Sequence, residues 1–215
     1  MRLLFRCCLL SLLCTCGRAP APPPTELSGT LRYRAADRSL EVTLRLSPAD
    51  TLPSAPVPTL FGSSLSPLPL AGTGVYRTRR QLELPPLIQL TAPCSTGDCP
   101  VALPFVAPRI DSLPAELSNS RSTAFPVADA GLTPAESIVV FFEPADRSSP
   151  RRLQLVGPST SGVLTLPARA LADVPPGKYE VYLIKQQLVR DSTEHLRYSL
   201  QTEYFTRSKN VTVTD

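Results

Sequence analysis

Residues 171–179, with the sequence LADVPPGKY, decide the fold of this 215-residue chain. The dipeptide Pro176–Gly177 fits a type II turn, because Pro presets φ at the second position and Gly accepts a positive φ at the third. The following residues alternate, so that Tyr179, Val181 and Leu183 share one face of a strand. The segment therefore predicts a β-strand that is entered through a tight turn and buries one face.

A Leu, a Pro-Gly turn and a Tyr at the start of a strand resemble the tyrosine corner of immunoglobulin-like and fibronectin-type β-sandwiches. In those folds the Tyr hydroxyl donates a hydrogen bond to a backbone carbonyl upstream. The resemblance implies that Tyr179 has a structural role and no functional one.

Alternation also marks residues 30–35 and 40–46, which a short turn joins. They predict an antiparallel hairpin with one buried face and one solvent-facing side, in a register that places Arg34 opposite Glu41. The buried face of this hairpin is expected to contain Leu31, Tyr33, Val42, Leu44 and Leu46.

Short strands continue through the rest of the chain, and Pro accounts for 25 of the 215 residues, which excludes long helices. A helical turn is expected only at residues 167–172, and residues 107–122 are expected to form a connection. Further strands are predicted at residues 59–61, 75–84, 87–91, 101–106, 137–143, 151–156, 163–166, 179–184, 196–202 and 210–214. This spacing predicts an all-β fold with one or two immunoglobulin-like antiparallel β-sandwiches.

The N-terminal residues predict export. Arg2 and Arg6 precede a short apolar run at residues 7–13, as in a secretory signal peptide, and this run is too short to span a bilayer. Without these two arginines the chain has 20 basic and 18 acidic residues, a net charge of +2. Such a small charge does not indicate a nucleic-acid partner.

The sequence LCTCG at residues 13–17 resembles the lipobox of bacterial lipoproteins, in which the final Cys is acylated; Cys14 departs from the usual Ala or Ser. The resemblance implies lipidation of Cys16. The alternative is an ordinary secreted protein that is cut after Gly17. The expected order is a signal peptide (1–15), a Pro-rich tether (16–25), an N-terminal β-sandwich-like domain (26–110) and a C-terminal immunoglobulin-like sandwich (122–215).

Cys94 and Cys99 are the two cysteines left after processing and acylation. An exported chain meets an oxidising compartment, so this pair predicts a disulfide across a tight turn. The spacing and the lack of a nearby His argue against a zinc site, and no other metal site is predicted.

Catalytic signals are weak. His195 beside Glu194 is expected to be an exposed loop residue, and residues 157–162 (GPSTSG) lack the G-x-S-x-G spacing of a nucleophile elbow. Glu180 and Glu203 are expected on solvent-facing sides. We therefore predict no catalytic residue and no cofactor. The candidate aromatic platforms for sugars are Tyr76, Tyr182, Tyr198, Tyr204 and Phe205, in a chain without Trp.

From residue 136 to the C-terminus, the layout resembles uncharacterised cell-envelope lipoproteins of Bacteroidota. The matching features are strand 138–142, segment 164–177 with its Pro-Gly turn, strand 179–184 and the closing strands around Tyr204. The resemblance implies sandwich halves and a lipid anchor in the cell envelope, without catalytic residues.

These expectations combine into a non-catalytic binding or scaffolding module, attached to a membrane through its lipid and partnered by an envelope protein or a glycan. The alternatives are a carbohydrate-binding accessory of a surface glycan system, and a small hydrolase that uses His195.

Overall fold

The computed structural model describes residues 23–47, 56–68, 74–146 and 149–215, and it confirms the all-β fold. The strands are β1 (Thr25–Arg34), β2 (Ser39–Ser47), β3 (Thr59–Leu60), β4 (Ser63–Ser64), β5 (Ser66–Pro67), β6 (Val75–Gln81), β7 (Leu87–Cys94), β8 (Gly97–Pro104), β9 (Glu116–Ser118), β10 (Thr123–Pro126), β11 (Glu136–Pro144), β12 (Arg151–Val156), β13 (Val163–Leu166), β14 (Gly177–Ser192), β15 (Leu196–Phe205) and β16 (Lys209–Thr214). Among the described residues, the one helix is the single turn α1 (Ala168–Leu171).

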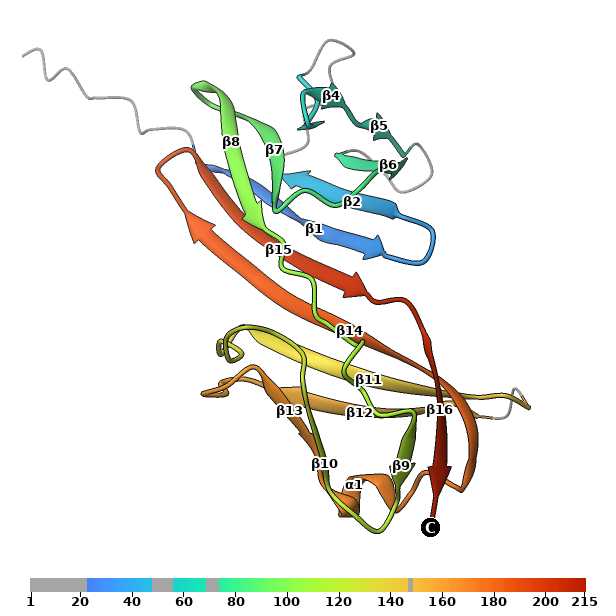
Figure 1. Ribbon diagram of the computed structural model, residues 1–215. Helices are drawn as coiled ribbons and strands as arrows, with labels where there is room; N and C mark the ends of the chain where they lie inside the picture. Colours follow the sequence, from blue (N-terminus) through green and yellow to red (C-terminus); the bar gives the residue numbers. More distant parts are fainter. Residues whose placement is uncertain (1–22, 48–55, 69–73, 147–148) are drawn as a thin grey trace, which may run out of the picture.

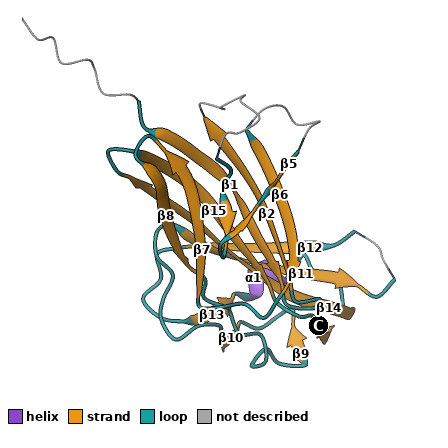
Figure 2. Ribbon diagram, turned by 90° about the horizontal axis from the view of Figure 1, so that it is seen from above, coloured by secondary structure: helices purple, strands orange, loops and turns teal. Residues whose placement is uncertain are grey.

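A ten-stranded sheet forms the continuous layer of the sandwich. Its main path runs in the order β12-β11-β14-β15-β1-β2-β6-β5, and β16 and β9 extend from β14. The four-stranded sheet β4-β3-β7-β8 lies over one face of the large sheet, as β7 and β8 show (Figures 1 and 2). A two-stranded sheet, β10-β13, covers the part near β11 and β14 (Figure 1).

Two hydrophobic clusters fill the space between these layers. One cluster joins β1, β2, β7, β8 and β15, and the other joins β10, β11, β13, β14 and β16. Strand β14 contributes to both clusters, since Leu183 is buried in the second cluster and Val189 packs against the first. Because alternate residues of a strand share a face, both clusters cover the same side of the large sheet. The opposite side is its outer face.

The sheet runs unbroken across both halves of the chain. Strand β15, from the C-terminal half, pairs in parallel with β1, from the N-terminal half. A second parallel pair joins β9 to β16. The division into domains at residues 26–110 and 122–215 stays a prediction, and the shared sheet shows that the halves are not separated in space.

The N-terminal hairpin forms with the predicted buried face but in a different register. Arg32, and not Arg34, lies opposite Glu41. The N–H of Ala35 donates to the carbonyl of Phe205 in β15, so Ala35 does not pair with β2. The last pair before the turn of the hairpin is therefore Arg34 with Ser39. A shift of two positions keeps every side chain on its predicted face, because the side-chain period of a strand is two.

Two other expectations need correction. Strand β1 begins at Thr25, inside the segment predicted as tether and earlier than residue 30. The predicted connection at residues 107–122 contains β9 and buries Ile110, Leu113 and Leu117 in the second cluster. Apolar residues spaced three or four apart within a polar stretch were the signal for this burial.

Candidate functional site

Tyr179 occupies the position that a tyrosine corner requires. Its hydroxyl donates a 2.7 Å hydrogen bond to the carbonyl of Pro175, four residues upstream. The side chain is 5% exposed, and its ring meets Phe142 edge-on with the centroids 6.0 Å apart. Burial raises the pKa of Tyr179 above its ordinary value, and the nearby Asp146 adds to this effect. These contacts give Tyr179 a structural role at the start of β14.

Replacing Tyr179 by Phe is expected to lower the free energy of unfolding by about 1 kcal/mol, because the change removes one net hydrogen bond and keeps the ring. Urea denaturation followed by circular dichroism measures this loss. Tyr182→Phe is the matched control: its hydroxyl donates to Glu143, whose side chain is exposed, so water can replace this bond and the loss is expected to cost less. An unchanged midpoint for Tyr179→Phe would contradict the structural role.

Cys94 and Cys99 form the predicted disulfide, which closes the turn of the β7–β8 hairpin. Beside it, the Ser95 hydroxyl lies 3.3 Å from Nδ1 of His195 in the turn between β14 and β15. The backbone carbonyl of His195 accepts a 3.0 Å hydrogen bond from the N–H of Thr25. The disulfide turn, the β14–β15 turn and the beginning of β1 therefore meet at one end of the molecule.

His195 is half-buried at this end and contacts a serine. Within the described ranges it forms no ion pair with a carboxylate, so the third member of a Ser-His-acid set is not present there. The same ranges contain no group of three or more His, Cys, Asp and Glu residues that could hold a metal ion. That the protein is not an enzyme stays a prediction.

Cys16 lies outside the described residues, as do the predicted signal peptide and all but the end of the predicted tether. Among the residues with a described structure, none belongs to a helix that is long and apolar enough to cross a bilayer. Lipidation of Cys16 therefore stays a prediction.

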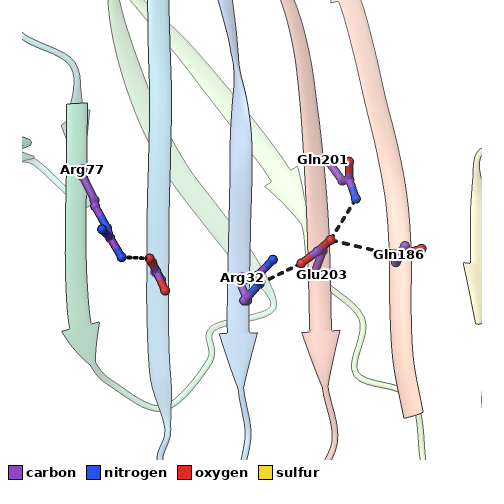
Figure 3. A network of polar contacts seen from close by, with 6 residues as sticks. Arg32, Arg77, Gln186, Gln201 and Glu203 are labelled. Atoms are coloured by element: carbon purple, nitrogen blue, oxygen red, sulfur yellow. Dashed lines mark hydrogen bonds and ion pairs between the residues drawn. The ribbon is translucent and has the colours of Figure 1, made fainter. Parts of the chain in front are cut away.

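A polar network crosses the outer face of the large sheet (Figure 3). Its centre is Glu203 on β15, whose side chain is only 9% exposed. This carboxylate accepts hydrogen bonds from Nε of Arg32 at 2.8 Å, from Gln186 at 3.3 Å and from Gln201 at 2.9 Å. Three donors from three adjacent strands thus hold a nearly buried charge.

Two further ion pairs continue across β2 and β6 on the same face. Arg77 pairs with Glu41 (Figure 3), and Arg79 pairs with Asp37 at 3.0 Å. Three other arginines of this face have no such ion pair among the described residues. Within the described residues, the exposed side chains of Arg34, Arg45 and Arg197 form no ion pair and no hydrogen bond that would satisfy their charge.

Next to the network lies a row of stacked aromatic rings. Phe141 and Tyr182 are parallel within 1°, with centroids 5.2 Å apart, and Tyr182 stacks on Phe205 at 6.5 Å. The guanidinium carbons of Arg32 and Arg34 lie 5.4 and 5.1 Å from the centroid of Phe205. Burial, together with the hydrogen bond to Glu143, raises the pKa of Tyr182 to about 12. The faces of Tyr182 and Phe205 are therefore in contact with other rings and with arginine.

The predicted aromatic platforms thus separate into two groups. Tyr182 and Phe205 lie on the outer face, whereas Tyr76 is buried in the first hydrophobic cluster and Tyr198 and Tyr204 pack against it. Sequence reasoning missed Phe141, Arg32 and Arg34 as members of one site. Alternation does place the two arginines on the solvent side, but only the strand order brings them to Phe205.

Comparison with known proteins adds no assignment. No protein-family model matches this chain, and no curated protein is significantly similar to it. The fold and the outer face of the large sheet therefore carry the argument about function, and the resemblance to envelope lipoproteins stays a prediction.

Proposed function

We propose that this chain is an exported protein of the cell envelope, anchored to a membrane through a lipid on Cys16, that acts as a non-catalytic binding module. Its binding surface is the outer face of the ten-stranded sheet. The observation that carries the binding role is the presence of exposed arginines without ion-pair partners on a face that no described element covers.

The N-terminal sequence supports the anchor, because a charged start, a short apolar run and a Cys in a lipobox-like setting precede a Pro-rich stretch. The Cys94–Cys99 disulfide supports export, since disulfides persist in oxidising compartments and are rare in the cytosol. Strand β1 starts beside the disulfide turn and His195, so this end of the molecule would face the membrane.

The same geometry favours binding over catalysis. On the outer face, Glu203 and Glu41 are held in ion pairs with Arg32 and Arg77, and the unpaired arginines are donors that recognise anions without reacting with them. The Ser95–His195 contact lies at the membrane-facing end, away from this face.

Replacing Cys16 by Ala is expected to move the protein from the detergent phase to the aqueous phase in a detergent-partition experiment, because the acyl chains would be lost. The wild-type protein should stay in the detergent phase when expressed in a bacterium that processes lipoproteins. Cys14→Ala is the matched control: it removes a neighbouring cysteine and restores a usual lipobox residue, so it should partition like the wild type. Equal partition of wild type and Cys16→Ala would contradict the anchor.

A further inference from the structure

We propose that the outer face of the large sheet binds an acidic polysaccharide, and that Arg34 together with the free amino groups of Arg32 receives its anionic groups. This inference rests on the proposed binding function and names the class of ligand. The chemistry required is a carboxylate or sulfate on an extended sugar chain.

The two guanidinium groups form a prepared anion site. Arg32 and Arg34 are two residues apart on β1, so they project from the same side, and both lie over the ring of Phe205. Arg32 donates its Nε to Glu203, which leaves its two terminal amino groups without a hydrogen bond among the described residues. Arg34 is held by the ring alone. A guanidinium whose position is fixed in this way loses little entropy when it binds a carboxylate through two parallel hydrogen bonds.

The charge of the face suits an anionic partner. From the strand registers, the outer positions of β1, β2, β6 and β15 carry six arginines and three glutamates, a balance of +3. Including Asp37 on the adjoining turn, which pairs with Arg79, lowers this to +2. The chain without Arg2 and Arg6 also has a net charge of +2, so the positive excess of the protein is concentrated on this face. The arginines are residues 32, 34, 45, 77, 79 and 197, and the glutamates are residues 26, 41 and 203.

The surroundings of the arginines favour a sugar chain over a peptide. Peptides that bind to sheets usually add a strand at an edge, where backbone groups are free. Here the central strands β15, β1 and β2 are each paired on both sides, so their backbone N–H and C=O groups are not free to bind a peptide strand. Hydroxyl and amide side chains lie between the arginines on this face and match sugar hydroxyls. They are Ser28, Thr30, Thr43 and Ser199, together with Gln186 and Gln201, whose amides also donate to Glu203.

Neutral sugars fit this face less well than acidic ones. A neutral sugar ring stacks on the flat side of an aromatic ring, but the flat sides of Tyr182 and Phe205 are in contact with other rings and with arginine. The arginines and the hydroxyl and amide side chains between them extend from β14 to β2, a width of roughly 14 Å at the usual strand spacing. Charge and hydrogen bonding are thus the means of recognition that this face provides.

The test is a titration of the full-length protein with three probes: carboxymethyl-dextran, unmodified dextran of the same length and poly-L-glutamate. We expect measurable binding of carboxymethyl-dextran only, and at least a tenfold loss of affinity in Arg34→Gln. Arg169→Gln is the matched control, because it removes the same charge from an exposed position on α1, away from the outer face. It should change the affinity less than twofold. Thermal midpoints verify that both variants are folded.

Equal losses in Arg34→Gln and Arg169→Gln would overturn the site, since they would show attraction to net charge alone. Binding of poly-L-glutamate as tight as that of carboxymethyl-dextran would overturn the choice of a sugar chain. If no probe binds the wild type, the acidic-polysaccharide site is wrong, while Cys16-dependent partition into detergent would still support the anchored module. If wild type and Cys16→Ala partition equally while carboxymethyl-dextran still binds selectively, the anchor alone is overturned.

Discussion

Replacing Lys185 by Met is expected to lower the free energy of unfolding by about 3 kcal/mol, one of the two largest effects that the structure predicts. Lys185 on β14 and Glu136 on β11 form a 2.8 Å ion pair with side chains only 10% and 8% exposed. Removing the ammonium group leaves a nearly buried carboxylate that still accepts a hydrogen bond from the backbone N–H of Thr133. That hydrogen bond keeps the cost at the lower end of the range for a broken buried pair.

A double variant separates the lost pairing from lost packing. Lys185→Met combined with Glu136→Gln removes both charges and keeps an acceptor for the N–H of Thr133. It should recover at least half of the loss seen in Lys185→Met, because a neutral amide costs less to bury than an unpaired carboxylate. Guanidinium denaturation at pH 7 measures both. Equal destabilisation in the single and double variants would show that packing, and not charge, holds this position.

The pair also gives stability a pH dependence. Burial raises the pKa of Glu136, but the hydrogen bonds from Lys185 and from the N–H of Thr133 outweigh it, so the net pKa lies below the ordinary value of 4.5. The ionised carboxylate therefore stabilises the fold fully above pH 4.5, and this contribution is lost as the pH falls through the lowered pKa. In the Lys185→Met variant the opposing effect of burial remains, so this acid-dependent loss should be absent.

The second large effect is expected at Gly29, in the middle of β1. A Cβ atom at this position would lie 2.2 Å from the backbone carbonyl oxygen of Thr43 and 3.0 Å from atoms of Leu44. Both belong to β2, the neighbouring strand, so the clash can be relieved only by moving paired backbone. Gly29→Ala should therefore cost about 3 kcal/mol or more, at the upper end for overpacking.

Thr30→Ala is the control for this prediction, because the next residue of β1 points to the outer face and should change stability by less than about 1 kcal/mol. The same denaturation series compares the two variants. A Gly29→Ala protein within 1 kcal/mol of the wild type would mean that β1 and β2 approach less closely than the structure shows.

Local patterns predicted the strands well where neighbours in sequence are also neighbours in space. The hairpin of β1 and β2 has its predicted buried face, and β12, which pairs with the preceding strand β11, has the predicted bounds. The hairpin register differs by two positions because Ala35 bonds to Phe205, a residue far along the chain. No local pattern contains that contact.

The outer-face site also depends on contacts between residues that are far apart in the chain. Alternation along β1 places Arg32 and Arg34 on the solvent side, and the same reasoning applies to Phe205 on β15. Their meeting depends on the parallel β1–β15 pair, which joins residues about 170 positions apart in the chain. Composition also hides the site, since a net charge of +2 spread over the whole chain would not indicate an anion-binding face.

We propose that Cys16 anchors this sandwich to a membrane, and mass spectrometry of the mature N-terminus tests this proposal most directly. Protein extracted from the membranes of a lipoprotein-processing bacterium should yield an N-terminal peptide that begins at Cys16 and carries the mass of a diacylglyceryl group, with or without a third acyl chain. An unmodified peptide that begins at Arg18, after cleavage behind Gly17, would contradict it and identify the chain as an ordinary secreted protein.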